Sequence, residues 1–160
     1  MTRTRSFAVR ATSPAPPAAV FALLADGARW ADWAGPLVPR SRWAPTGAPA
    51  PGVGAVRILG LPPLSTREEI VEYVPGRGLA WTVRGGGLPV RDYQVSVHLE
   101  PSAGWTEMVW TGRFRPAVPG TGRAVQAALR VVLATFARRS AVAAGRGSRT
   151  VGGQAAGGGS

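Results

Sequence analysis

The spacing of apolar residues in the second half of the sequence constrains the fold more than any other feature. From Val90 to Glu100 and from Thr106 to Phe114, apolar and polar residues alternate, as in strands that bury one face. After Pro119 and Gly120 the apolar residues recur every three or four positions, which predicts a helix with one apolar stripe. Such a sheet and such a helix can cover each other. If the sheet curves around the helix, the space between them is an apolar cavity, which is typical of a small-molecule site.

Shorter patterns complete the predicted order of elements. Alternation over 5–11 predicts a first strand, and the prolines that follow predict a helix start, since proline is favoured in the first helical turn. Pro and Gly pairs then separate short apolar runs at hairpin spacing. The predicted order is a strand (5–11), a helix (16–25), a short helix around Trp30 and Trp33, six strands (37–43, 56–61, 66–74, 79–84, 90–100, 106–114) and a long helix. Helices at the two ends of an antiparallel meander make an α+β fold in one domain.

Composition excludes several classes of site. The 160 residues contain no cysteine and one histidine. Disulfides, thiolate metal sites and cysteine nucleophiles are therefore excluded, as are multi-histidine metal sites and a Ser-His-Asp relay. We expect no metal and no cofactor.

The sequence also bears on location. The apolar stretch over 124–137 is too short to span a membrane and contains Arg130. The N-terminal arginines and the apolar residues after them resemble a signal or transit peptide. Prolines at 14, 16 and 17 interrupt this region, so we interpret it as the first strand and helix. We expect a cytoplasmic protein.

Positive charge is concentrated in the last third of the chain. The formal net charge is +11, and from Arg113 onward there are eight arginines and no acidic residue. These arginines could be a solvated face enriched by a GC-rich genome, or could bind a polyanion or an anionic membrane surface. We do not expect nucleic acid binding, because RNA-binding aromatic motifs and a helix-turn-helix pattern are absent. Glycine and arginine dominate the C-terminus, so we expect a domain over 1–143 and a disordered tail over 144–160.

Several short motifs follow one another in a characteristic order. They are the segment 15–26 with Trp30 and Trp33 after it, Gly52-Val53-Gly54, Glu72-Tyr73-Val74-Pro75, Leu79-Ala80-Trp81, Arg91-Asp92-Tyr93 and Trp110-Thr111-Gly112-Arg113-Phe114. Over about residues 5–143 the sequence resembles the SRPBCC superfamily, which includes START-like domains and the polyketide cyclase/dehydrase and lipid transport proteins. The resemblance implies a helix-grip fold, a curved antiparallel sheet of about seven strands that encloses an apolar cavity with the C-terminal helix. It also implies binding of lipids, polyketides or other apolar compounds, with cyclisation or dehydration in a minority of members.

Large side chains at inward positions are the candidate ligand contacts. Tyr and Trp combine an apolar body with a polar end, which suits amphipathic ligands. The same side chains could instead fill a solid core, and Trp33 could cap the entrance or anchor a helix. The candidate set is Trp33, Trp81, Arg91, Tyr93, Val95, Val97, Met108, Trp110, Phe114, Leu129, Val132 and Phe136.

Two groups of polar residues could do chemistry in such a site. Arg91 shares the parity of Tyr93, and a buried arginine without a partner is costly, so Arg91 must lie at a wet mouth or meet a carboxylate. Together they could orient a ligand carboxylate, phenolate or carbonyl, or Arg91 could simply be solvated. Glu68, Glu69 and Glu72 share a strand whose inward parity is unclear, and one of them could act as an acid or base.

Three functions follow. We expect non-catalytic binding or carriage of a hydrophobic or amphipathic molecule, lipid- or polyketide-like, in an internal cavity. The alternative is an aromatase/cyclase- or dehydrase-type enzyme, with Arg91, Tyr93 and Glu69 as the catalytic candidates. The third is a basic surface that binds a polyanion or weakly contacts an anionic membrane. The sequence does not indicate the oligomeric state.

Overall fold

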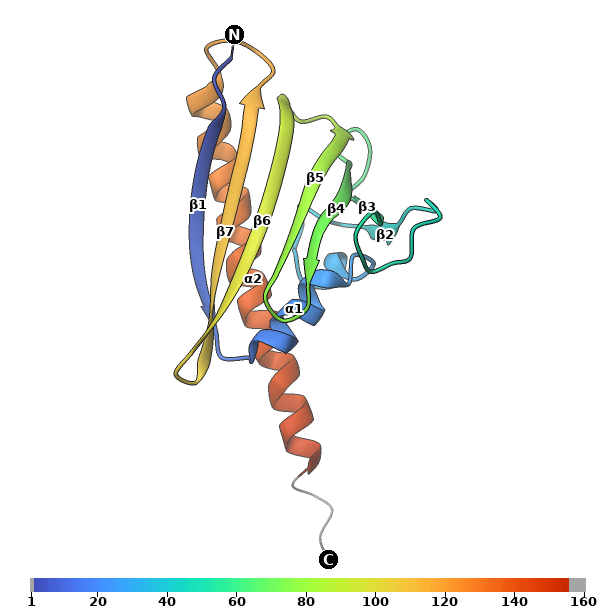
Figure 1. The fold of residues 1–160 in the computed structure, drawn as a ribbon, viewed down its shortest axis with the longest axis vertical. Coiled ribbons are helices and arrows are strands. Elements are labelled where there is room, and N and C mark those ends of the chain that lie inside the picture. Colours follow the sequence, from blue (N-terminus) through green and yellow to red (C-terminus); the bar gives the residue numbers. More distant parts are fainter. Residues whose placement is uncertain (1, 156–160) are drawn as a thin grey trace, which may run out of the picture.

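The computed structural model describes residues 2–155, and the side chains of residues 2–150 (Figure 1). Seven antiparallel strands form one sheet in the order β1-β7-β6-β5-β4-β3-β2. Each strand from β2 to β7 therefore pairs with its neighbour in sequence, and β1 closes the other edge on β7. The strands are β1 (Arg5–Ser13), β2 (Ser41–Trp43), β3 (Val56–Leu59), β4 (Thr66–Val74), β5 (Gly78–Gly86), β6 (Val90–Ser102) and β7 (Trp105–Pro116).

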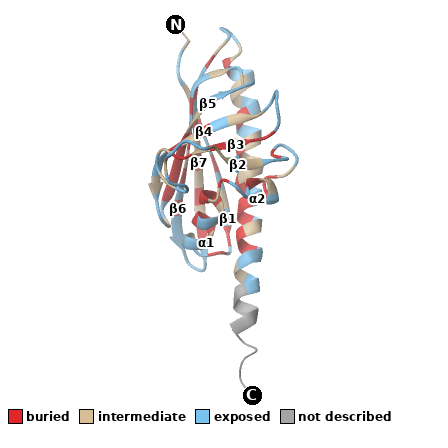
Figure 2. Cartoon of the chain, turned by 90° about the vertical axis from the view of Figure 1, so that its right-hand side faces the viewer, coloured by how far each residue is buried: buried red, intermediate tan, exposed pale blue. Residues whose placement is uncertain are grey.

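Helices cover one face of this sheet. α1 (Pro17–Ala25) and the 3-10 helix η1 (Trp30–Asp32) connect β1 to β2, and α2 (Gly122–Ala155) runs the length of the sheet behind it (Figure 1). The buried residues lie between the sheet and the helices (Figure 2). This is the α+β helix-grip architecture that the sequence predicts, with seven strands and a long C-terminal helix. Among the described residues, no helix has an apolar stretch long enough to cross a bilayer.

The alternation in β6 and β7 sets the face that α2 covers. Tyr93, Val95 and Val97 are buried on β6, and their polar neighbours in sequence are more exposed. In the ladder, Val97 pairs with Trp110 and Val95 with Gly112. A Cβ on Gly112 would lie 2.5 Å from the Phe7 ring of β1, so the absence of a side chain at Gly112 makes room for this ring.

The C-terminal helix extends further than the sequence predicts. Residues 144–155 continue α2, whereas the sequence predicts a disordered tail from 144; residues 156–160 lie outside the described part. Small side chains explain the continuation, because they let the helix approach the segment after β1. The Ser13 hydroxyl donates to the Ala141 carbonyl at 2.8 Å, and a Cβ on Gly145 would lie 2.7 Å from Pro14 Cγ. The boundary predicted after residue 143 stays a prediction.

Candidate functional site

The concave face of the sheet brings most of the candidate ligand contacts together. Eight of them are buried on β5, β6, β7 and α2, with at most 7 % of each residue exposed, and two more on α2 are half-buried. The eight are Trp81, Tyr93, Val95, Val97, Met108, Trp110, Phe114 and Leu129, and the two are Val132 and Phe136.

Aromatic rings fill the space at the centre of this face. Trp30 of η1 lies 4.6 Å from Trp33, 5.6 Å from Trp81 and 5.7 Å from Phe136, measured between ring centroids. Its indole N–H donates to the Leu24 carbonyl at 2.9 Å, which fixes the ring against α1. Trp33 is therefore part of the packed aromatic cluster. Through Trp30, η1 packs against both β5 and α2.

A buried ion pair lies beside this cluster. The Arg57 Nε donates to the Glu68 Oε2 at 2.9 Å, and Arg57 Nη2 lies 2.8 Å from the same oxygen. Arg57 is fully buried, and its guanidinium carbon lies 3.9 Å from the ring centroid of Trp30 and 4.3 Å from that of Trp81. The cation is thus held by one carboxylate and two indole faces, which offset part of its desolvation. Burial lowers the pKa of Arg57, while the charge of Glu68 and its hydrogen bond act in the opposite direction.

The register of a hairpin creates this pair. Arg57 on β3 lies directly opposite Glu68 on β4 in the ladder, and both point to the concave face. The Thr66 hydroxyl donates to the second carboxylate oxygen of Glu68 at 3.0 Å. Glu69 lies on the outer face instead, where it accepts a hydrogen bond from the Arg84 Nε at 2.8 Å. The inward glutamate is therefore Glu68, and the structure does not place the catalytic candidate Glu69 inside the grip.

Besides Arg57 Nη2, whose contact with Glu68 is an ion pair and not a hydrogen bond, three buried polar atoms have no hydrogen-bond partner among the described residues. They are the hydroxyl of Tyr93 and the indole nitrogens of Trp33 and Trp110. Buried donors are nearly always paired in folded proteins, so donors without a partner mark places where a ligand atom could bind. Burial raises the pKa of Tyr93, and the negative charge of Glu68 adds to the effect. The phenol therefore stays protonated and is a hydrogen-bond donor at neutral pH.

Arg91 does not lie on the buried face with Tyr93, although the two-residue alternation of the sequence predicts that both side chains share one face of β6. The ladder between β6 and β7 skips from Arg91 to Gln94, and Asp92 between them has a φ of 50°. This bulge interrupts the alternation, so Arg91 is exposed while Tyr93 is buried. Asp92 is exposed as well and forms an ion pair with Arg115. The expected pair of Arg91 and Tyr93 is therefore not assembled.

A groove lies outside the grip, between α1, η1 and the far part of α2. Its volume is about 850 Å³, and its lining includes Leu23, Trp33, Arg138, Arg139 and Val142. Trp33 thus borders both the aromatic cluster and this groove. Among the described residues, no three His, Asp or Glu side chains lie close enough to hold a metal ion.

Arg57 is the residue that the sequence analysis missed. Along 55–59 the buried positions hold Ala55, Arg57 and Leu59, and the half-buried positions between them hold Val56 and Ile58. Both half-buried residues are apolar and one buried residue is charged, so hydrophobicity does not indicate which face is buried. A signal does exist in hindsight, because opposite charges that face each other across a predicted hairpin indicate a cross-strand pair.

A family model matches this chain in sequence, and solved structures match it in fold. The family model described as polyketide cyclase/dehydrase and lipid transport matches residues 4–141. The protein XoxI from Bacillus cereus is 18 % identical with a TM-score of 0.70, over 86 % of this chain and 94 % of that chain. Norcoclaurine synthase from Thalictrum flavum, in truncated form, is 14 % identical with a TM-score of 0.69, over 88 % and 92 %. Ara h 8.0201 is 16 % identical with a TM-score of 0.65, over 84 % and 96 %. No curated protein matches the sequence.

Proposed function

Because the chain belongs to the polyketide cyclase/dehydrase and lipid transport family, we propose that it binds a hydrophobic or amphipathic small molecule between the concave face of the sheet and α2. The ligand is lipid- or polyketide-like, with an apolar body and a polar end. Carriage of this molecule, rather than its chemical conversion, is the proposed role.

The observation that carries this proposal is the set of buried donors without a partner on a mostly apolar face. The hydroxyl of Tyr93 and the indole N–H of Trp110 have no partner among the described residues. A purely structural core would fill these positions with phenylalanine or leucine, because a buried polar group without a hydrogen bond costs free energy. Carbonyl or carboxylate oxygens of a bound molecule would satisfy these donors.

Incomplete burial of apolar side chains at one end of the sheet supports ligand entry there, into the space between the sheet and α2. Val83, Leu88, Val90 and Val125 pack against the core but are only partly buried, whereas Trp110 is fully buried. These four lie near the end of the sheet where β5 leads into β6 and where α2 begins. In the proposal, the ligand enters at this end, and the half-buried side chains and the ring of Phe136 shift to admit its apolar body.

A fluorescent fatty acid, cis-parinaric acid, tests the proposal by titration against the full chain. We expect saturable binding that weakens about tenfold or more in Tyr93→Phe, because a hydrogen bond to a charged group contributes about 1.5–3 kcal/mol. Tyr73→Phe is the matched control, since Tyr73 is half-buried on β4 and packs edge-on against Phe21. Absence of saturable binding, or equal losses in the two variants, would contradict the proposal.

Catalysis is the second candidate, and one observation favours it. A protonated Tyr93 beside the Arg57–Glu68 pair could donate to a carbonyl oxygen that gains negative charge during cyclisation or dehydration. A poly-β-keto thioester separates the two functions. An enzyme would convert it, with turnover lost in Tyr93→Phe while binding persists, whereas a carrier would release it unchanged.

A further inference from the structure

Three loops meet at the upper end of the sheet, where the N-terminus also lies (Figure 1). They are residues 60–65 between β3 and β4, residues 87–89 between β5 and β6, and residues 117–121 between β7 and α2. The Ala117 N–H donates to the Pro89 carbonyl at 2.9 Å, which joins the second and third loops. A Cβ on Gly87 would lie 2.8 Å from the Pro63 carbonyl oxygen, so the first and second loops are also in contact. We call these three loops the upper rim.

Aliphatic side chains project from the upper rim into solvent. Leu61 is 42 % exposed, Leu64 is 75 % exposed and Val118 is 53 % exposed. Single exposed apolar residues are ordinary on protein surfaces. Here they lie on adjoining loops together with exposed prolines. Such a group of exposed apolar residues is typical of a surface that contacts a membrane or another protein.

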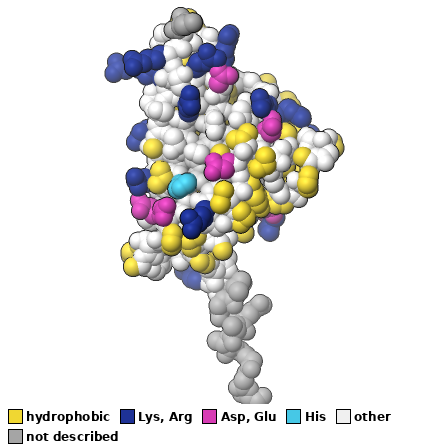
Figure 3. All heavy atoms as spheres, viewed as in Figure 1, with side chains coloured by type: hydrophobic (Ala, Val, Ile, Leu, Met, Phe, Trp, Pro, Cys, Tyr) yellow, Lys and Arg dark blue, Asp and Glu magenta, His cyan; other side chains and the backbone are white. Residues whose placement is uncertain are grey.

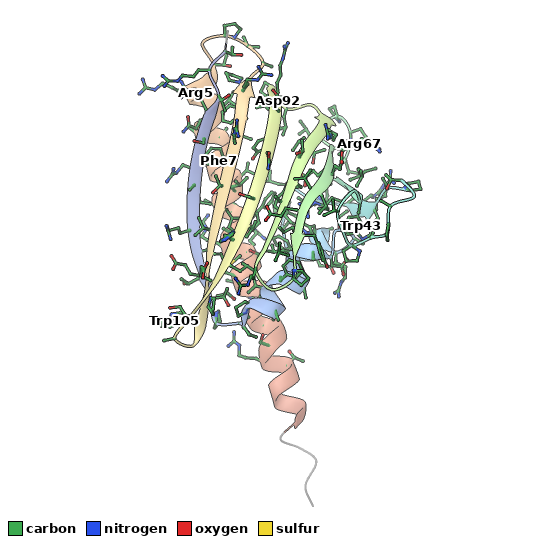
Figure 4. The ribbon with its side chains drawn as sticks, in the orientation of Figure 1. Arg5, Phe7, Trp43, Arg67, Asp92 and Trp105 are labelled. Atoms are coloured by element: carbon green, nitrogen blue, oxygen red, sulfur yellow. The ribbon has the colours of Figure 1, made fainter. Side chains whose placement is uncertain are left out.

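An exposed arginine follows each of these loops. Arg67, Arg91 and Arg123 have no carboxylate within 4 Å among the described residues. Figure 3 shows arginine side chains at the upper end of the outer face of the sheet, and Figure 4 places Arg67 and Arg5 there. The nearby Asp92 is already paired with Arg115. The surface that borders the upper rim is therefore positively charged, and the tips of its loops are apolar.

We propose that the upper rim docks on an anionic phospholipid bilayer. Leu61, Leu64 and Val118 enter the interface, and the three arginines bind lipid phosphates, for which a guanidinium is well suited. A nucleic acid fits this surface less well, because binding of single strands uses aromatic side chains as stacking platforms. Trp105, a large exposed aromatic side chain, lies at the opposite end of the sheet (Figure 4). This docking goes beyond the proposed ligand site and does not depend on the ligand's identity.

Co-sedimentation of the full chain with vesicles tests the proposal. We expect binding to equal parts phosphatidylcholine and phosphatidylglycerol, and none to phosphatidylcholine alone. The triple variant R67Q/R91Q/R123Q should bind about 100-fold more weakly, since each arginine near an anionic surface contributes about fivefold. Leu64→Ser should weaken binding about tenfold, as expected for one leucine side chain withdrawn from an apolar phase.

Matched variants elsewhere on the chain provide the controls. R138Q/R146Q/R149Q removes three exposed arginines from the far part of α2, and Val53→Ser removes a side chain that is 62 % exposed on another loop. We expect both to bind vesicles like the wild-type chain, and all four variants to keep its melting temperature. Equal losses in the two arginine triples, or equal effects of Leu64→Ser and Val53→Ser, would overturn the proposal. So would binding to a DNA oligonucleotide that needs the rim arginines but not Leu64, or no binding to either vesicle.

Discussion

Replacement of Arg57 by methionine removes one half of the buried ion pair while keeping an unbranched side chain of comparable length. Glu68, with 8 % of the residue exposed, is then left without a cation within 4 Å among the described residues. The faces of Trp30 and Trp81 also lose their contact with the guanidinium. Removing one partner of a buried pair costs about 3–5 kcal/mol, and lost cation–π contacts add about 1 kcal/mol. We expect the free energy of unfolding to fall by about 4–6 kcal/mol.

Urea unfolding followed by tryptophan fluorescence measures this change. The midpoint should fall while the slope stays the same, because the area exposed on unfolding is nearly unchanged. Arg84→Met is the control: Arg84 pairs with Glu69 at 2.8 Å, but its side chain is 58 % exposed. Exposed pairs contribute about 0–1 kcal/mol, so this variant should unfold close to the wild-type midpoint.

The double variant R57M/E68M separates a buried pair from a packing defect. Replacing both charges with apolar groups removes the unpaired carboxylate, so the double variant should be more stable than R57M by about 2–3 kcal/mol. The reasoning is refuted if R57M costs no more than Arg84→Met. It is also refuted if the stability lost in R57M/E68M equals the sum of the stabilities lost in R57M and in E68M, because the two side chains would then not interact.

Three other positions give independent predictions. Because the pKa of Tyr93 is higher in the folded than in the unfolded chain, Tyr93 contributes its full stabilisation below the unfolded pKa of 10.0 and loses it as the pH rises above that value. In Tyr93→Phe, the free energy of unfolding should therefore fall less steeply above pH 10 than in the wild-type chain. Urea midpoints measured across alkaline pH test this. In Gly112→Ala, the new Cβ meets the Phe7 ring, so unfolding should become about 1–3 kcal/mol easier, and adding Phe7→Leu should restore part of the loss. Trp110→Ala should cost about 3–5 kcal/mol by thermal or urea unfolding, whereas Trp105→Ala, at an exposed hairpin tip, should cost less than about 0.5 kcal/mol.

The fold could be predicted from sequence where one residue period persists over a whole element. The alternation across β6 and β7 and the apolar stripe that begins α2 are both of this kind, and they lead directly to a sheet covered by a helix. The end of α2 could not be predicted in the same way. Composition suggested disorder beyond residue 143, but glycine and alanine there allow a close approach to Pro14, and that contact appears only in three dimensions.

The candidate site was harder to predict, because it depends on places where the alternation is interrupted. Irregular pairing next to Glu68 hides which of the glutamates on β4 points inward. The bulge at Asp92 separates Arg91 from Tyr93. A bulge inserts a residue without leaving a distinct composition, so a pattern of period two cannot register it. The buried position of Arg57 could not be predicted for a related reason. On its strand, the apolar residues Val56 and Ile58 lie on the less buried face.

Native mass spectrometry of the full chain decides whether an apolar or amphipathic molecule binds between the sheet and α2. We expect the mass of the chain plus a single small molecule, either retained from the expression host or acquired from a mixture of long-chain acids and aromatic polyketides. The adduct should be lost in a Trp110→Phe/Tyr93→Phe variant whose circular dichroism and cooperative unfolding show that it still folds. The mass of the chain alone in both preparations, or an adduct that persists in the double variant, would contradict the proposed ligand binding.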